Sequence, residues 1–231
     1  MRNLVIGDIH GAYKALIQCF ERSNFDYKDD TLIVLGDVAD GWNEVPLCIE
    51  ELFKVKNMTY IWGNHDWWVN RWFKEGWTHP VWELQGGEAT KKAYIKQGDL
   101  MVKHRCFFDV ANAAYVDDKN RLFVHGGLYP INRPLEKQEL NDLMWDRGLF
   151  QSARFKHFQK PDFKYGKYDK IFLGHTSTFK GHDYPYQYCN VWNLDQGAGW
   201  YGKLTIMDID TEEYWQSDNV LELYPNVRGR Y

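Results

Sequence analysis

The chain has 231 residues, which suits one large domain over residues 1–231, and its net charge of −4 includes no basic stripe of the kind that binds nucleic acid. The four cysteines show no Cys-x-x-Cys spacing, so neither a zinc ribbon nor a redox motif is expected. The sequence contains neither a secretory signal nor an apolar run long enough to span a bilayer, so we predict a cytoplasmic protein without a membrane partner.

The first predicted strand, residues 4–6, breaks at a glycine and delivers Asp8 and His10 at its end. A strand that ends in this way projects both polar side chains from one edge of a sheet, where they can hold a metal ion. Residues 12–22 follow with apolar side chains at helical spacing, which predicts a helix that returns to the sheet.

The same design recurs in the next two predicted strands, residues 31–35 and 59–62, which end in Gly-Asp-Val-Ala-Asp-Gly and Gly-Asn-His-Asp. The polar residues that these two motifs deliver are Asp37, Asp40, Asn64 and His65. A helix is predicted between the two strands, over residues 43–53. Two successive β–α–β units imply parallel strands with right-handed crossovers, so the first third of the chain is predicted to be α/β.

Residues 67–100 have an irregular, aromatic pattern that includes Trp82-Glu-Leu-Gln-Gly-Gly-Glu-Ala-Thr90. Because this segment lies between strands that carry candidate ligands, it would crowd the central sheet if it joined it. We therefore predict a largely helical cap that controls substrate access. Its aromatic rings are expected to serve in packing, with stacking on a nucleobase as the alternative. Residues 100–110 are ambiguous.

Two further strands are predicted at residues 121–124 and 170–173, and they run into His125-Gly-Gly and Gly-His175-Thr. Five apolar strands therefore each deliver Asp, Asn or His at a glycine-bearing carboxyl end. An open α/β sheet places its binding crevice at that edge.

The remainder of the C-terminal half carries fewer polar signals. A helix is predicted from residue 136 and reaches Trp145-Asp-Arg147, and the polar run 152–167 is predicted to be a surface excursion. Three strands are predicted in the tail, over residues 188–194, 203–209 and 214–217. The last two are spaced as a hairpin, and the tail predicts a second, antiparallel sheet.

Carboxylate, amide and imidazole groups without cysteine suit divalent cations such as Mn²⁺, Fe²⁺ and Zn²⁺. A pair of such ions needs one shared carboxylate, and Asp37, central in chain order, is the natural bridge. One site is then completed by Asp8 and His10, and the other by Asn64, His125 and His175. Two such ions would lower the pKa of a shared water and make hydroxide the nucleophile.

His65 follows the candidate ligand Asn64 but is expected to point elsewhere, so it is placed to protonate the leaving oxygen. Asp40 could hold the other ring nitrogen of His65 and keep the imidazole charged. We therefore predict His65 and Asp40 as the catalytic pair.

These five motifs, in this order, resemble those of the calcineurin-like metallophosphoesterases, in particular the phosphoprotein phosphatase branch. The chain is most similar there to bacterial and phage serine/threonine phosphatases and to their diadenosine-tetraphosphatase relatives. The resemblance implies an α/β fold of four layers, with two β-sheets packed face to face between helices. It also implies the ligand set given above, with His65 as proton donor and Asp40 as its partner.

The resemblance further implies two arginines that hold the substrate phosphate, with Asn64 beside them. Arg147 matches the second arginine, whereas Gly41 and Trp42 stand where the first should follow Asp40. Lysine would not reproduce the bidentate geometry of a lost guanidinium. The residues that could compensate are Asn43, Arg71 and Arg133.

We therefore predict a phosphomonoesterase similar to serine/threonine protein phosphatases, acting on a phosphorylated protein or a small phosphate ester. Two divalent ions are expected as cofactors, with Mn²⁺ as the first choice and Fe, Zn or Ni as alternatives. The missing arginine keeps a dinucleoside polyphosphate hydrolase or cyclic nucleotide phosphodiesterase as the alternative. An inactive metal-binding scaffold is the least favoured reading.

Overall fold

The computed structural model describes residues 1–95, 97–227 and 229. Its strands are β1 (Asn3–Ile6), β2 (Thr31–Val34), β3 (Asn57–Tyr60), β4 (Tyr115–Val116), β5 (Arg121–Phe123), β6 (Lys170–Leu173), β7 (Tyr186–Tyr188), β8 (Val191–Asn193), β9 (Thr205–Asp208) and β10 (Tyr214–Gln216). Its helices are α1 (Tyr13–Arg22), α2 (Val45–Leu52), α3 (Asn64–Glu75), α4 (Pro80–Trp82), α5 (Glu88–Ile95), α6 (Leu100–Asp109), α7 (Leu140–Trp145), α8 (Gly148–His157) and α9 (Val220–Leu223). A π-helical turn, η1 (Glu83–Gly87), and a 3-10 turn, η2 (Leu135–Lys137), complete the described elements.

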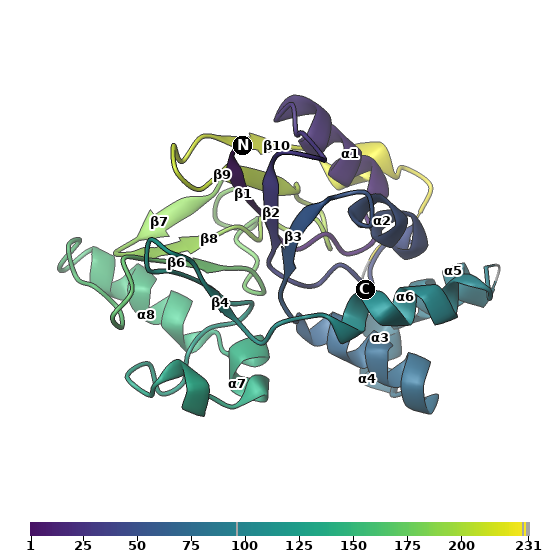
Figure 1. Ribbon diagram of the computed structural model, residues 1–231, viewed down its shortest axis with the longest axis horizontal. Helices are drawn as coiled ribbons and strands as arrows, with labels where there is room; N and C mark the ends of the chain where they lie inside the picture. The colour runs from purple at the N-terminus through teal and green to yellow at the C-terminus, as the bar shows by residue number, and fades with distance from the viewer. Residues whose placement is uncertain (96, 228, 230–231) are drawn as a thin grey trace.

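The strands of the described residues form two mixed sheets of five strands each (Figure 1). The first sheet has the order β10-β9-β1-β2-β3, and the second has the order β4-β5-β6-β8-β7. The strands β1, β2 and β3 are parallel to one another, as are β5, β6 and β8. The five strands predicted to carry polar residues are therefore divided between the two sheets.

The alternation of side chains along β1 separates two apolar layers. Val5 packs between the sheets with Phe123 and Phe172, whose rings stack at a centroid distance of 4.9 Å. Leu4 and Ile6 belong to the core beneath α1, α2 and the cap. Because both faces of these strands are covered, their sequences are continuous apolar runs.

The outer face of the second sheet is covered by helices from the C-terminal half. Leu122 and Ile171 pack with Leu149 and Phe150 of α8. The molecule therefore has four layers, in the order α1 and α2, the first sheet, the second sheet, and α7 with α8 (Figure 1). This arrangement confirms the predicted fold class.

The segment predicted as a cap is largely helical and comprises α3, α4, η1 and α5. The ambiguous residues 100–110 form α6, which packs on α2 and α3 (Figure 1). His104 lies buried among these helices, 2.7 Å from the hydroxyl of Tyr94 and 2.7 Å from the carboxylate of Glu50. Within the described ranges, no helix combines the length and apolar character needed to cross a bilayer.

The C-terminal hairpin lies in the first sheet, so the prediction that the tail forms a second, antiparallel sheet was wrong. Its strand β9 pairs antiparallel with β1, with Met207 opposite Val5, and also with β10. Ile206 and Met207 are both fully buried. A strand with two apolar faces is suited to the interior of a sheet, next to β1, and not to an exposed edge.

Three local predictions also differ from the structure. Residues 188–194 contain the turn of the β7–β8 hairpin, near Cys189 at φ 56°, and do not form one strand. The helix predicted from residue 136 begins at Leu140. The excursion predicted over residues 152–167 starts inside α8, whose polar residues face solvent while its apolar side packs on the second sheet.

Arg121 of β5 ties the second sheet to the first. Its guanidinium donates hydrogen bonds to the carboxylates of Asp117 at 2.6 Å and Asp210 at 2.7 Å, and to the carbonyl oxygen of Ile209 at 2.8 Å. Arg121→Ala should lower the free energy of unfolding by about 3 kcal/mol in urea titrations, because it breaks the ion pairs of a buried guanidinium with two carboxylates. Lys119→Ala, which removes an exposed partner of Asp210, should cost far less. Equal losses would contradict this assignment.

Candidate metal centre

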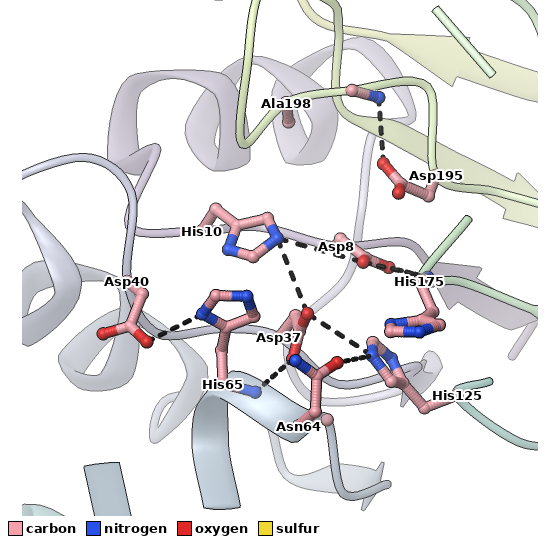
Figure 2. Close-up of polar contacts among 12 residues, drawn as sticks. Asp8, His10, Asp37, Asp40, Asn64, His65, His125, His175, Asp195 and Ala198 are labelled. Atoms are coloured by element: carbon pink, nitrogen blue, oxygen red, sulfur yellow. Dashed lines mark hydrogen bonds and ion pairs between the residues drawn. The ribbon is translucent and has the colours of Figure 1, made fainter. Parts of the chain in front are cut away.

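Each candidate ligand lies just beyond the carboxyl end of a strand, and the strands come from both sheets. Asp8 and His10 follow β1, Asp37 follows β2, Asn64 begins α3 after β3, His125 follows β5, and His175 follows β6. The structure brings all six side chains together (Figure 2). None of them is more than 7% exposed, so the cluster is enclosed by protein.

Four residues of this region have left-handed backbone conformations, which non-glycine residues adopt at a cost. They are His10 (φ 50°), Asp37 (φ 48°), Asp40 (φ 67°) and His175 (φ 64°). Neighbouring loops hold them in place, since the backbone N–H of His10 donates to the carbonyl oxygen of Asp37 at 2.8 Å. Strained backbone of this kind concentrates at functional sites.

Asp37 lies at the centre of the cluster (Figure 2). Its Oδ1 accepts a hydrogen bond from the backbone N–H of His65 at 2.9 Å. Its Oδ2 lies 3.6 Å from Nε2 of His10 and 3.3 Å from Nε2 of His125. Asp37 therefore lies between a histidine of the first sheet and a histidine of the second, the position that a shared carboxylate needs.

Backbone carbonyl groups fix the orientation of two imidazoles. The Nδ1–H of His10 donates to the carbonyl oxygen of Ala39 at 3.0 Å, and that of His125 donates to the carbonyl oxygen of Leu35 at 2.8 Å. Because Nδ1 is engaged in this way, Nε2 of each ring faces the centre, where its lone pair is available to a metal ion when the imidazole is neutral. The Nε2 of His175 is buried and has no hydrogen-bond partner in the part of the chain that the structure describes. Lone pairs aimed in this way fit a metal ion.

The charges of the cluster favour a cation beside His125. Its Nε2 lies 3.1 Å from Oδ1 of Asn64 and close to Asp37, so electron-rich atoms converge there. Burial lowers the pKa of His125, but the carboxylates of Asp37 and Asp8 outweigh it and raise the pKa to about 9. Burial and His125 lower the pKa of His175 to about 2, which keeps that imidazole neutral, as a metal ligand must be.

The donor atoms form two groups that share one carboxylate. His10, Asp37 and His65 make one group, and Asp37, His125 and His175 make the other, with donor atoms within 4.8 Å of one another in each. Asp8 lies beside the first group, since its carboxylate is 4.0 Å from Nε2 of His10 and accepts the backbone N–H of His175 at 3.0 Å. This nitrogen and oxygen donor set fits divalent ions such as Mn²⁺, Fe²⁺ or Zn²⁺.

The predicted catalytic pair is in contact. The Nδ1–H of His65 donates to Oδ2 of Asp40 at 2.8 Å, and both side chains are almost completely buried (Figure 2). The ring of His65 meets the ring of His10 edge to face, at a centroid distance of 4.9 Å. His65 is thereby held next to the candidate ligands.

A cavity of about 270 Å³ opens onto the cluster and is lined by Asp37, Asn64, His65, His175 and Arg147. The exposed Arg147 donates to the carbonyl oxygen of His175 at 2.7 Å, which ties its guanidinium to this rim. Sequence reasoning missed Ser177 and Lys180, which also line the cavity. The Ser177 hydroxyl oxygen is buried without a hydrogen-bond partner among the described residues.

The three residues that could have replaced the missing arginine lie elsewhere. Asn43 and Arg133 line other cavities, and Arg71 pairs with Glu75 at 3.2 Å. Gly41 itself has φ 93°, a conformation that an arginine would adopt only under strain. The backbone therefore accounts for glycine at this position.

Sequence reasoning also missed Asp66, although it lies in the quoted Gly-Asn-His-Asp motif. Its buried carboxylate accepts the backbone N–H of Ala39 at 2.9 Å, which braces the loop that holds His10. Burial, followed by the charge of Asp37, raises the pKa of Asp66 to about 7. The motif was the available signal, because each of its polar members has a defined contact.

Comparison with known proteins identifies similar chains. The family model described as calcineurin-like phosphoesterase matches residues 1–188. The symmetrical bis(5'-nucleosyl)-tetraphosphatase of Proteus mirabilis (strain HI4320) is 25% identical over 281 residues, which cover 96% of this chain and 100% of that protein. Serine/threonine-protein phosphatase 1 of Salmonella typhimurium is 23% identical over 220 residues, which cover 89% of this chain and 90% of that protein.

The fold is also similar to solved structures. A protein serine/threonine phosphatase from Saccharomyces cerevisiae superposes with a TM-score of 0.62 at 15% identity, covering 100% of this chain and 83% of that one. Similarity at this level of identity concerns the fold. It agrees with the two packed sheets described above.

Proposed function

We propose that this chain, which belongs to the calcineurin-like phosphoesterase family and is a metal-dependent phosphoric ester hydrolase, cleaves phosphomonoesters of phosphoproteins or small compounds. The observation that supports this most is Asp37, whose Oδ2 faces Nε2 atoms of His10 and His125. Two bound ions would activate a water nucleophile and neutralise charge on the phosphoryl oxygens. Mn²⁺ is our first choice, with Fe, Zn or Ni as alternatives.

We assign each residue of the centre a role. The residues proposed to hold the first ion are Asp8, His10 and Asp37, and those proposed to hold the second are Asp37, Asn64, His125 and His175. His65 gives a proton to the leaving oxygen from Nε2, since its Nδ1 is engaged by Asp40. His65 also lines the cavity of about 270 Å³ in which the substrate phosphate would bind.

The substrate phosphate would be held at the rim of the cavity. Arg147 offers a planar guanidinium, and Lys180 offers a point charge on the same cavity. The buried hydroxyl of Ser177 supplies a further donor. These groups would bind the phosphate in place of the arginine that is expected directly after Asp40, where this chain has Gly41.

A second cavity supports an alternative substrate class, the dinucleoside polyphosphates. It has a volume of about 220 Å³ and shares Thr176, Ser177 and Lys180 with the first. Arg154 and Tyr188 also line it. Neither Lys180 nor Arg154 forms an ion pair within the described residues, so both can meet further phosphates. A substrate with several phosphates and an aromatic base would fill both cavities.

The test is a substrate panel with Mn²⁺ and with chelator, comprising p-nitrophenyl phosphate, a phosphoserine peptide, diadenosine tetraphosphate and 2',3'-cyclic nucleotides. Turnover should require the metal. If polyphosphates are substrates, Arg154→Ala should lower kcat/KM for diadenosine tetraphosphate about tenfold or more, because Arg154 lines only the second cavity and its loss weakens charge pairing with the further phosphates. The aryl phosphate should be affected much less.

Lys156→Ala is the matched control, because Lys156 lies on α8 but not in either cavity. A preference of about tenfold or more for the phosphopeptide would refute the polyphosphate alternative. Absence of metal-dependent turnover on every substrate would refute the proposed function itself.

A further inference from the structure

We propose that Trp82 and Thr90 of the cap are positioning residues, which hold Asp40, and through it His65, in the orientation that delivers a proton to the leaving group. The inference rests on the proposed function, because it takes His65 as the proton donor. It assigns a role to the run from Trp82 to Thr90, which the ligand set leaves unexplained.

The side chain of Asp40 joins the cap to the metal centre. It is fully buried, and its Oδ2 accepts hydrogen bonds from Nδ1–H of His65 and Nε1–H of Trp82, both at 2.8 Å. Its Oδ1 accepts the hydroxyl of Thr90 at 2.7 Å. The backbone N–H of Asp40 donates in turn to the Thr90 oxygen at 3.2 Å. Both carboxylate oxygens are thus held, so the plane of the carboxylate is fixed.

The two glycines of this run let the cap approach closely. A Cβ atom on Gly86, at φ 105°, would lie 2.2 Å from the backbone nitrogen of Gly41, the residue after Asp40. A Cβ atom on Gly87 would lie 2.5 Å from Nε1 of Trp82. Only glycine fits at either position. The two glycines therefore let the cap come close enough for Trp82 and Thr90, on either side of them, to contact Asp40.

These contacts have a chemical consequence for His65. A carboxylate that is free to rotate would no longer fix the direction of the imidazole. Removing these contacts should slow protonation of the leaving oxygen. It should not weaken metal binding, because neither Trp82 nor Thr90 is a candidate ligand. A basic leaving group needs that proton, whereas a weakly basic leaving group departs without it.

The test compares leaving groups in the full-length protein with Mn²⁺. Trp82→Phe and Thr90→Val should each lower kcat for phenyl phosphate about tenfold or more, which is part of the usual contribution of a general acid. For 2,4-dinitrophenyl phosphate, the fall should be less than about threefold, because the leaving group needs no proton. Thr90→Ser keeps the hydroxyl and should retain the wild-type ratio of the kcat values for phenyl phosphate and 2,4-dinitrophenyl phosphate.

Trp72→Phe is the matched control. Its ring lies 5.9 Å from that of Trp82, but none of its contacts involves Asp40. It should leave the ratio of the two rates unchanged. An equal fall on both substrates in Trp82→Phe and Thr90→Val would overturn the inference, since it would indicate a general structural defect.

A second readout does not depend on activity. Nuclear magnetic resonance of ¹⁵N-histidine protein should show the hydrogen-bonded Nδ1–H of His65, shifted or broadened in Trp82→Phe and Thr90→Val but not in Trp72→Phe. An unchanged resonance in both cap variants would overturn the inference. If the wild-type protein hydrolysed no phosphate ester, the proposed function would fail, and this resonance would still decide whether the cap orients His65.

Discussion

Replacing Asp37 with asparagine should abolish metal-dependent hydrolysis, with a loss of about a thousandfold or more, because bound metal supplies several kcal/mol of transition-state stabilisation. The fold should survive the change. An amide NH₂ in place of Oδ2 can donate to Nε2 of His125, which lies 3.3 Å away. The substitution therefore keeps a hydrogen bond in the buried cluster when no cation is bound. It also removes the negative charge that the two proposed metal ions would share.

Turnover of p-nitrophenyl phosphate and Mn²⁺ binding by calorimetry measure the two effects of Asp37→Asn. Asp26→Asn is the matched control, because this exposed carboxylate accepts backbone N–H groups in a turn, which an amide oxygen also does. It should keep full activity. Retained metal binding with retained turnover in Asp37→Asn would remove the basis for a shared carboxylate.

The second large effect is expected from His65→Asn. Loss of the proton donor should lower kcat for phenyl phosphate by about a hundredfold to ten-thousandfold, the range that general acid catalysis supplies. Hydrolysis of 2,4-dinitrophenyl phosphate should fall far less, and the content of bound metal should stay the same. Rates on both substrates and metal analysis of the variant provide the check.

The metal content of His65→Asn separates two roles for this residue. His65 lies close enough to His10 and Asp37 to be a ligand, but its Nδ1 is engaged by Asp40. If one ion per chain were lost together with activity on both substrates, His65 would be a ligand and not the proton donor.

Much of the architecture could be predicted because local sequence determined it. Residues 4–6 and 32–35 are apolar on both faces, and glycine followed by aspartate marks where each strand must end. Parallel pairing followed from the helices between them. The candidate ligands could be predicted for the same reason, since each directly follows a strand.

Other features depend on contacts between distant segments. Nothing local to residues 205–208 indicates that β9 pairs with β1 at the opposite end of the chain. The role of Thr90 is equally hidden, because its hydroxyl meets Asp40 only after the cap has folded. Lys180 and Ser177 were missed because neither directly follows a strand, and the loop that carries them reaches the cavity from His175.

The central claim is that two metal ions share Asp37. Anomalous scattering from crystals grown with Mn²⁺ tests it most directly. Two peaks are expected about 3.5–4 Å apart, one beside His10 and one beside His125, with the Asp37 carboxylate between them. A single peak, or peaks that do not contact Asp37, would contradict it.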